Sequence, residues 1–400
     1  MRKLFMILVA GLLMVACGHK ESSTEETSTA ETMAEAPAPA LVAEKVLIGN
    51  LYYNLYDDNT AEVVRDDSYR TSPYLTLTIP SKTRYEYEVY TVTSIGNCAF
   101  SGCANFTAVE IPNSVTNIED AAFDDCTGLT AVEIPNSVTH IGKGAFSRCS
   151  NLYVPIYNKH VFAYMPTSYK GAYAIPHGIK QIAGKAFYNC TGLTSVTIPN
   201  TVTSIGDYAF DRCTGLRSIT IPNSVTYIGA GALGGIDFSV PIYNEHVFVF
   251  LPYSYEGAYA IPQGIKQIAG GAFSERSGLT SITIPNSVTR IDVSAFEGCR
   301  NLTSLTIPNS VKSIGSRAFE DCTGLTSVTI SNGVIAIGMD AFRNCRNLTS
   351  LTIPNSVQSI GIAAFGGCTG LTSVTLPTSI QEIGANAFYG CTNLQIVYEE

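Results

Sequence analysis

Residues 325–345 read LTSVTISNGVIAIGMDAFRNC, and this stretch decides the fold. Residues 327–330 alternate polar and apolar side chains, a pattern that predicts a short β-strand with one apolar face. Val334, Ile337 and Phe342 then add apolar side chains at wider spacings. A unit of this size cannot bury these side chains by itself, so it is stable only when stacked against similar units.

The phenylalanine of this unit recurs along the chain. Nine of the eleven intervals between its slots are 23 residues, and the other two are 41 and 40. A period of 20–29 residues with Leu, Ile and Val at fixed places is the signature of a leucine-rich solenoid. We therefore predict a mainly β solenoid. The slots are Phe100, Phe123, Phe146, Phe187, Phe210, Leu233, Phe273, Phe296, Phe319, Phe342, Phe365 and Phe388.

The repeat L-x-x-V-x-I-P-x-x-V-x-x-I-G-x-x-A-F-x-x-C resembles that of the BspA-type leucine-rich repeat family of bacterial surface proteins, over about residues 91–400. Residues 46–94 are similar to the N-terminal β cap of that family. The resemblance implies a curved right-handed solenoid over residues 95–400, displayed on the cell surface. Some members are adhesins for host extracellular proteins or other cells, so the resemblance implies binding without naming a partner.

The N-terminus predicts a targeting signal. Arg2 and Lys3 precede thirteen uncharged, mostly apolar residues, 4–16, which is too short for a membrane-spanning helix and typical of a signal peptide. Met14-Val15-Ala16-Cys17 resembles a bacterial lipobox, although the consensus prefers Leu at Met14. We predict a lipoprotein signal peptide over residues 1–16 and lipid attachment at Cys17. An ordinary cleaved signal peptide is the alternative.

Residues 17–45 predict a lipidated cysteine followed by a disordered tether. The segment is rich in Ser, Thr, Glu, Ala and Pro and has almost no core-forming side chains. Gly18, rather than an Asp that would favour retention at the inner membrane, follows Cys17. We therefore expect a lipid-anchored protein of the cell envelope, in the outer membrane and exposed at the surface.

Composition and motifs exclude several function classes. The formal net charge is −9, and the sequence shows no run of basic residues, which argues against nucleic acid and against an anionic lipid surface as partners. The five histidines form no H-E-x-x-H pair, and the chain has neither a G-x-S-x-G elbow nor a phosphate loop. We expect no enzymatic activity, no cofactor and no metal, with membrane contact through the lipid anchor alone.

Ten cysteines share one position of the repeat. Their 23-residue spacing is unlike that of a zinc site, and equivalent side chains of a solenoid point the same way, which disfavours disulfides. Arg276 occupies one slot of this series. We predict a ladder of buried free thiols, formed by Cys103, Cys126, Cys149, Cys190, Cys213, Cys299, Cys322, Cys345, Cys368 and Cys391.

The outward positions of the predicted strands are mostly Ser and Thr, as in Ser304/Thr306 and Ser327/Thr329. Thr suits an exposed strand, so strand propensity and solubility explain this face. A binding face for glycans or an extended polypeptide is the alternative.

Two nearly identical insertions, about residues 153–176 and 239–262, interrupt the period. Each predicts one strand, at 161–165 and 247–251, and a Tyr-rich turn. Tyrosine combines a large contact area with a polar tip, so we expect ligand contacts here, with packing of the longer coil as the alternative. The candidate contact residues are Tyr157, Tyr169, Tyr243, Tyr253 and Tyr255.

Together these features predict a non-enzymatic cell-surface lipoprotein for binding or adhesion. Its partners would be extracellular or host proteins or glycans, recognised through the repeat array. A structural spacer of the cell envelope without a specific ligand is the alternative function.

Overall fold

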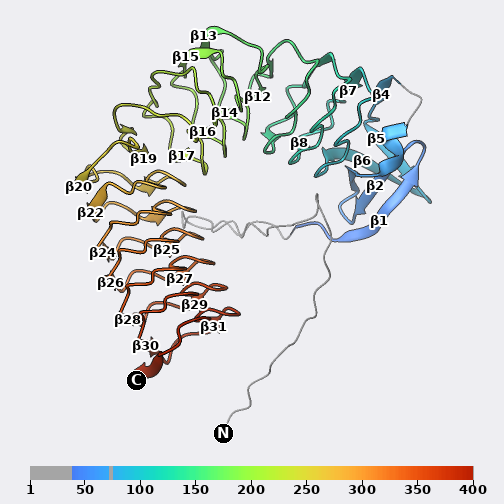
Figure 1. The fold of residues 1–400 in the computed structure, drawn as a ribbon. Coiled ribbons are helices and arrows are strands. Elements are labelled where there is room, and N and C mark those ends of the chain that lie inside the picture. Colours follow the sequence, from blue (N-terminus) through green and yellow to red (C-terminus); the bar gives the residue numbers. More distant parts are fainter. Residues whose placement is uncertain (1–37, 72–74, 400) are drawn as a thin grey trace.

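The computed structural model describes residues 38–71 and 75–399. The predicted signal peptide, Cys17 and residues 18–37 of the tether lie outside the described residues. Within these ranges the fold is a mainly β solenoid whose coils follow a curved arc (Figure 1). The only helical element described is a 3-10 helix, η1 (Asp67–Thr71). A search of the described part for a helix long and apolar enough to cross a membrane found none.

A small β cap opens the array. The cap begins with an antiparallel sheet, in which β2 (Leu51–Tyr56) lies between β1 (Leu41–Ile48) and β3 (Thr60–Val64). The other edge of β3 pairs in parallel with β6 (Glu88–Ile95). β5 (Lys82–Tyr85) completes the cap as an antiparallel partner of β6. β1 begins inside the range 17–45 predicted as a tether, because Leu41 and Ala43 pair with residues of β2. The predicted boundary after residue 45 is therefore too late.

Short strands line the concave side of the arc and form three successive sheets, together called the concave sheet (Figure 1). Outside the cap and the two insertions these strands are two residues long and end on an isoleucine, which is buried in every strand except β31, where Ile383 is exposed. Beyond β6 they are β8 (Asn117–Ile118), β10 (His140–Ile141), β11 (Ile156–Tyr157), β12 (Val161–Tyr164), β14 (Gln181–Ile182), β16 (Ser204–Ile205), β17 (Tyr227–Ile228), β18 (Ile242–Tyr243), β19 (Val247–Phe250), β21 (Gln267–Ile268), β23 (Arg290–Ile291), β25 (Ser313–Ile314), β27 (Ala336–Ile337), β29 (Ser359–Ile360) and β31 (Glu382–Ile383).

The Ser/Thr strands lie on the convex side and are divided into sheets of two or three strands (Figure 1). Bending a stack of coils separates their outer edges, so the convex ladder is the one that opens. These strands are β4 (Thr76–Thr78), β7 (Ala108–Glu110), β9 (Ala131–Val132), β13 (Gly171–Ala174), β15 (Leu193–Thr197), β20 (Gly257–Ala260), β22 (Leu279–Thr283), β24 (Ser304–Ile307), β26 (Ser327–Ile330), β28 (Ser350–Thr352), β30 (Ser373–Pro377) and β32 (Gln395–Glu399).

The core between the two sides is a ladder of stacked aromatic rings. Phe342 and Phe365, for example, stack with ring centroids 5.3 Å apart and planes within 2°. The ten ladder cysteines are free thiols, as predicted, and all are buried except Cys391, which is half-buried. Most of them also donate a hydrogen bond: the Cys345 thiol donates to the Phe319 carbonyl of the preceding coil at 3.3 Å. The thiol therefore satisfies a buried backbone acceptor as well as filling space.

Two seams divide the concave sheet, one at each insertion. The sheet runs from β1 to β10, from β11 to β17 and from β18 to β31 as three separate pieces. The ring ladder is interrupted near the same places. New ladders begin where Tyr157 stacks on Phe162 and Tyr243 on Phe248, and Leu233 takes the ring slot in the coil before the second seam. The predicted strands at 161–165 and 247–251 are present as β12 and β19, each paired antiparallel with the short strand before it.

Candidate functional site

Two positions of each concave coil matter for the site. The residue just before the strand is called the first position, and the first residue of the strand is called the second position; the second position is buried at Val161, Val247 and Gln267. First positions are exposed or half-buried from β8 to β31. Their backbones form a hydrogen-bonded ladder, in which the Thr203 N–H donates to the Lys180 carbonyl at 2.8 Å and the Lys180 N–H to that of His160 at 2.7 Å. The sheet therefore holds these side chains at a fixed spacing.

At these two positions the charges share one sign over most of the arc. From β10 to β25 the first and second positions contain no Asp or Glu, and within the described coils the only acidic residue at these positions is Glu382. The basic residues at these positions form a set that we call the basic strip. It comprises His140, His160, Lys180, His246, Lys266, Arg290 and Lys312.

A polar cluster lies at the centre of the strip, beside the second seam. The Arg290 guanidinium stands over the ring of Tyr227 at 5.5 Å from its centroid and pairs with the Asp292 carboxylate. Gln267 donates from its side-chain amide to Asp292 and to the Ile228 carbonyl, the latter at 3.0 Å. The cluster therefore joins strands on both sides of the seam and fixes the orientation of Arg290.

Asp292 itself is nearly buried, and burial raises the pKa of its carboxyl group. It occupies a slot that is glycine in most coils, including Gly361. A Cβ added to Gly361 would lie 2.5 Å from the Met339 nitrogen, which shows how closely the coils approach there. The acidic side chain at this slot is therefore a local departure that supports the exposed Arg290 from below.

A second exposed ring lies beside the first seam. Lys143 spans the seam, with its ammonium 4.6 Å from the centroid of the Tyr208 ring and 3.7 Å from the Asp207 carboxylate. Cation–π contacts at exposed sites are worth about 0.5–1 kcal/mol, enough to orient both side chains. Tyr208 and Tyr227 thus present aromatic rings near the middle of the arc, and both rings are partly exposed.

Apolar side chains lie beside the last residues of the basic strip and beyond its end. Val293, Ile335, Met339 and Ile362 are between 41% and 52% exposed, and we call them the apolar stripe. Ile335 occupies the first position directly after Lys312, to whose carbonyl its N–H donates at 2.8 Å. The other three share the position that follows the glycine slot. In the coils before residue 210 this position carries polar or charged residues such as Asp120, Lys143 and Asp207.

The five tyrosines singled out from the sequence do not converge on one site. Tyr157 and Tyr243 lie on β11 and β18, where each is almost half exposed and stacks by its other face on a buried phenylalanine. They mark the two seams, 86 residues apart in the chain. Each is an exposed ring whose position is fixed by the aromatic ladder.

Tyr169 and Tyr255 lie in the turns that lead to β13 and β20 on the convex side. Their hydroxyls donate to the carbonyls of Ala172 and Ala258, at 2.7 and 2.5 Å. Each ring is partly buried, and the Tyr169 ring packs edge-to-face on that of Tyr173. These contacts give both residues a role in closing the turn.

Tyr253 is partly exposed and covers a buried guanidinium. Arg276, which takes the cysteine slot after the second insertion, is 1% exposed, and its guanidinium carbon lies 3.7 Å from the Tyr253 ring centroid and 4.7 Å from that of Phe250. Its Nε donates to the Leu251 carbonyl at 2.6 Å. Burial lowers the pKa of this guanidinium. Phe162, Tyr164, Phe248 and Phe250 are all buried, in line with the packing alternative.

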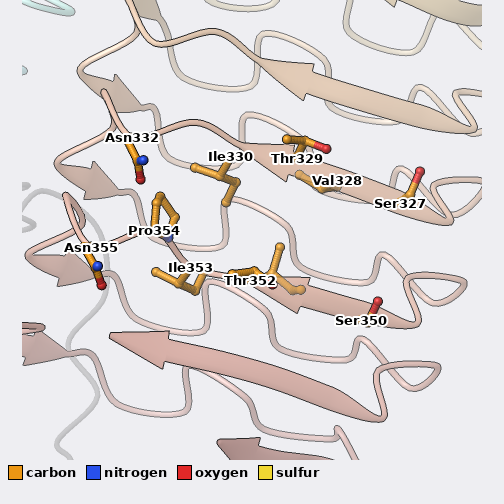
Figure 2. Close-up of a pocket in the computed structure, with 11 residues that line it drawn as sticks. Ser327, Val328, Thr329, Ile330, Asn332, Ser350, Thr352, Ile353, Pro354 and Asn355 are labelled. Carbon is orange, nitrogen blue, oxygen red and sulfur yellow. The ribbon is translucent and has the colours of Figure 1, made fainter. Parts of the chain in front are cut away.

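Two open hollows lie on the Ser/Thr face of the described coils. The larger, about 460 Å³, lies between β26 and β28, where the convex sheet is open (Figure 2). Its lining includes Ser327, Thr329, Ser350 and Thr352 but no aromatic or charged side chain. Such side chains supply most interface hot spots, so the convex face is a poor candidate for a binding site.

The constant positions of the repeat specify the core and do not reveal the concave residues. The signal was present in the variable ones: the residues before Ile141, Ile228 and Ile291 are His140, Tyr227 and Arg290. Among the residues that the structure describes, no group of three or more His, Cys, Asp or Glu side chains could hold a metal ion.

The chain is similar to known leucine-rich repeat proteins. The family model described as "BspA type Leucine rich repeat region" matches residues 85–161, 156–243, 254–346 and 335–398, well over half of the chain. A solved leucine-rich repeat protein from Bacteroides ovatus is similar at 27% identity, covering 89% of this chain and 100% of its own, with a TM-score of 0.38. A leucine-rich cell surface protein from Faecalibacterium prausnitzii is similar at 28% identity, covering 91% and 96%, with a TM-score of 0.43. No curated protein matches the chain.

Proposed function

The chain belongs to the BspA-type leucine-rich repeat family, and on that premise we propose that it is a non-enzymatic binding protein of the bacterial cell surface. Its partners are extracellular proteins or glycans, taken up on the concave face of the arc. One observation carries the proposal. The exposed positions of the concave strands differ from coil to coil, whereas those of the convex strands are Ser and Thr in most of the regular coils, with Ala108/Glu110 and Ala131/Glu133 as the exceptions.

The concave face has the properties of a pre-organised binding surface. Its side chains stand on a backbone ladder, so little conformational entropy is lost when a partner docks. Tyr227 and Arg290, two residue types enriched in hot spots, lie at its centre. Tyr157 and Tyr243 provide further exposed rings at the seams, and Tyr253 provides a third near the second insertion.

We assign the lipid anchor to the same proposal. Cys17 would carry the acyl chains, and the segment after it would hold the array away from the outer membrane. Proteinase treatment of intact cells should then remove the array, and Cys17→Ser should release the protein from the membrane fraction. An array that resists the proteinase until the cells are broken would place it inside the envelope.

Binding of the full chain to an array of extracellular matrix proteins and glycans tests the proposed function. We expect saturable binding that falls at least tenfold in the Tyr208→Ala/Tyr227→Ala variant, the scale of a lost hot spot. The matched control is Thr306→Ala/Thr329→Ala on the convex face, which should bind as the parent does. Absence of saturable binding to every probe would instead favour the structural spacer, and equal losses in both variants would move the site away from the concave face.

A further inference from the structure

We infer that the concave face takes up a protein partner through a segment that is acidic along one part and apolar along the next. The inference rests on the proposed function and narrows it to one class of partner. The acidic part lies on the basic strip, and the apolar part on the apolar stripe.

The charge of the basic strip is not compensated where it is most exposed. Lys180, Lys266 and Lys312 are exposed, and no described residue forms an ion pair with any of them. They belong to a chain whose net charge is −9, so the acidic residues are concentrated elsewhere. A concave surface of one sign attracts a partner of the other sign and accelerates its association.

The spacing of these lysines matches an extended peptide. Neighbouring coils are about 4.8 Å apart, so the six coil steps from Lys180 to Lys312 span roughly 29 Å on the concave side. An extended chain covers that length in about nine residues, at about 3.3 Å per residue. A short acidic segment is therefore long enough to meet all three ammonium groups.

The apolar stripe decides between a polypeptide and an acidic polysaccharide. Three of its four residues lie beyond Lys312, beginning with Ile335, whose N–H donates to the Lys312 carbonyl, and Val293 lies one coil before Lys312. The backbones beneath Met339 and Ile362 are joined to neighbouring coils by hydrogen bonds, as in Asp340 N–H to the Ile362 carbonyl at 2.9 Å. A protein can cover these aliphatic side chains with its own apolar groups and gain the free energy of burial. A hydroxylated, charged polysaccharide would place polar groups against them, which is unfavourable.

Three probes test the inference with the full chain: poly-L-glutamate, a peptide of nine glutamates followed by a leucine-rich end, and heparin as an anionic polysaccharide. We expect the mixed peptide to bind most tightly. Raising the salt concentration should weaken its binding, because salt screens exposed charges. The triple variant Lys180→Glu/Lys266→Glu/Lys312→Glu should lose at least tenfold in affinity for both peptides.

Matched controls separate charge from position. Lys82→Glu/Lys170→Glu/Arg346→Glu makes the same change of net charge at exposed residues outside the concave strands and should retain binding. Met339→Ser/Ile362→Ser should weaken the mixed peptide several-fold and leave poly-L-glutamate unchanged. The melting temperature of each variant shows that it is folded.

Two results would overturn the inference. If both charge-reversed triple variants lose the same affinity for the peptides, the effect depends on net charge and not on position. If heparin binds more tightly than the mixed peptide, and Met339→Ser/Ile362→Ser does not change its affinity, the face binds a polysaccharide. A further result distinguishes the inference from the proposed function. If Tyr208→Ala/Tyr227→Ala abolishes binding to a matrix protein while the lysine reversals do not, the face binds partners but not by this chemistry.

Discussion

The side-chain amide of Asn158 donates to the carbonyl of Val138 at 2.7 Å, across the first seam of the solenoid. The same amide group donates to Pro135, and its oxygen accepts from the backbone N–H groups of His160 and Val161. Asn244 repeats the arrangement at the second seam with the carbonyls of Pro222 and Val225. One buried side chain thus replaces the backbone ladder where each insertion interrupts it.

Asn158→Ala should therefore destabilise the protein by about 1–3 kcal/mol, because it leaves buried carbonyls and N–H groups without partners. Chemical denaturation followed by circular dichroism measures the change. Asn113→Ala, at an exposed turn, is the control and should be close to neutral. Because solenoid stability depends on contacts between neighbours, we also expect the Asn158 variant to unfold less cooperatively. A neutral Asn158→Ala would show that the amide bonds do not support the seam.

The cysteine slots after the two insertions predict unequal costs for the same substitution. Arg276 fills its slot with a guanidinium that stacks on two rings and bonds to Leu251, whereas the Cys190 thiol reaches the Met165 carbonyl only at 3.6 Å. Arg276→Ala should destabilise the protein by about 3 kcal/mol or more, since it leaves a cavity and an unsatisfied carbonyl. Cys190→Ala should destabilise the protein by about 1 kcal/mol, which is close to the free energy of burying one methylene group. Thermal unfolding compares the two, and equal shifts would contradict the prediction.

Removing the hydroxyl of Tyr169 or Tyr255 should lower stability rather than affinity. Each hydroxyl donates to a carbonyl three residues on, so Tyr169→Phe and Tyr255→Phe should each cost about 1 kcal/mol. Tyr157→Phe, whose ring is exposed and stacked by one face only, serves as a control of similar size. Urea midpoints test this, and binding to the mixed peptide should remain that of the parent in all three variants. A loss of affinity without a loss of stability would restore Tyr169 and Tyr255 as direct contacts.

Stability should fall at alkaline pH because of the buried thiols. Burial raises the pKa of Cys103 and of Cys391 to about 11, from 9.0. As pH rises above 9, the unfolded chain releases these protons first, so the folded state is favoured less. The stability that depends on these protonated thiols is fully present below pH 9 and is lost between about pH 9 and 11. Urea unfolding over this range should show a smaller decline in Cys103→Ala than in the parent, and an equal decline would assign the effect to other groups.

The sequence by itself determined the solenoid. The 23-residue recurrence of Phe342 and its equivalents, together with Val334 and Ile337, specifies a coil that is stable only when stacked, and the family match confirms it. The thiol ladder and the strands of the insertions followed from the same logic, because equivalent residues of a repeat occupy equivalent places. The sequence was sufficient to predict these features because each of them depends only on contacts between adjacent coils, and adjacent coils are adjacent repeats in the sequence.

Only the tertiary structure decided which face is concave and what it gathers. Lys180, Lys266 and Lys312 lie far apart in the chain and form no basic run, yet the coils place all three at the same position of the concave side, Lys180 before the second seam and the other two after it. The curvature, the seams held by Asn158 and Asn244, and the pairing of Arg290 with Asp292 depend on how whole coils pack. The physical reason is that a repeat dictates what each coil contains, whereas bending is set by the summed contacts between coils.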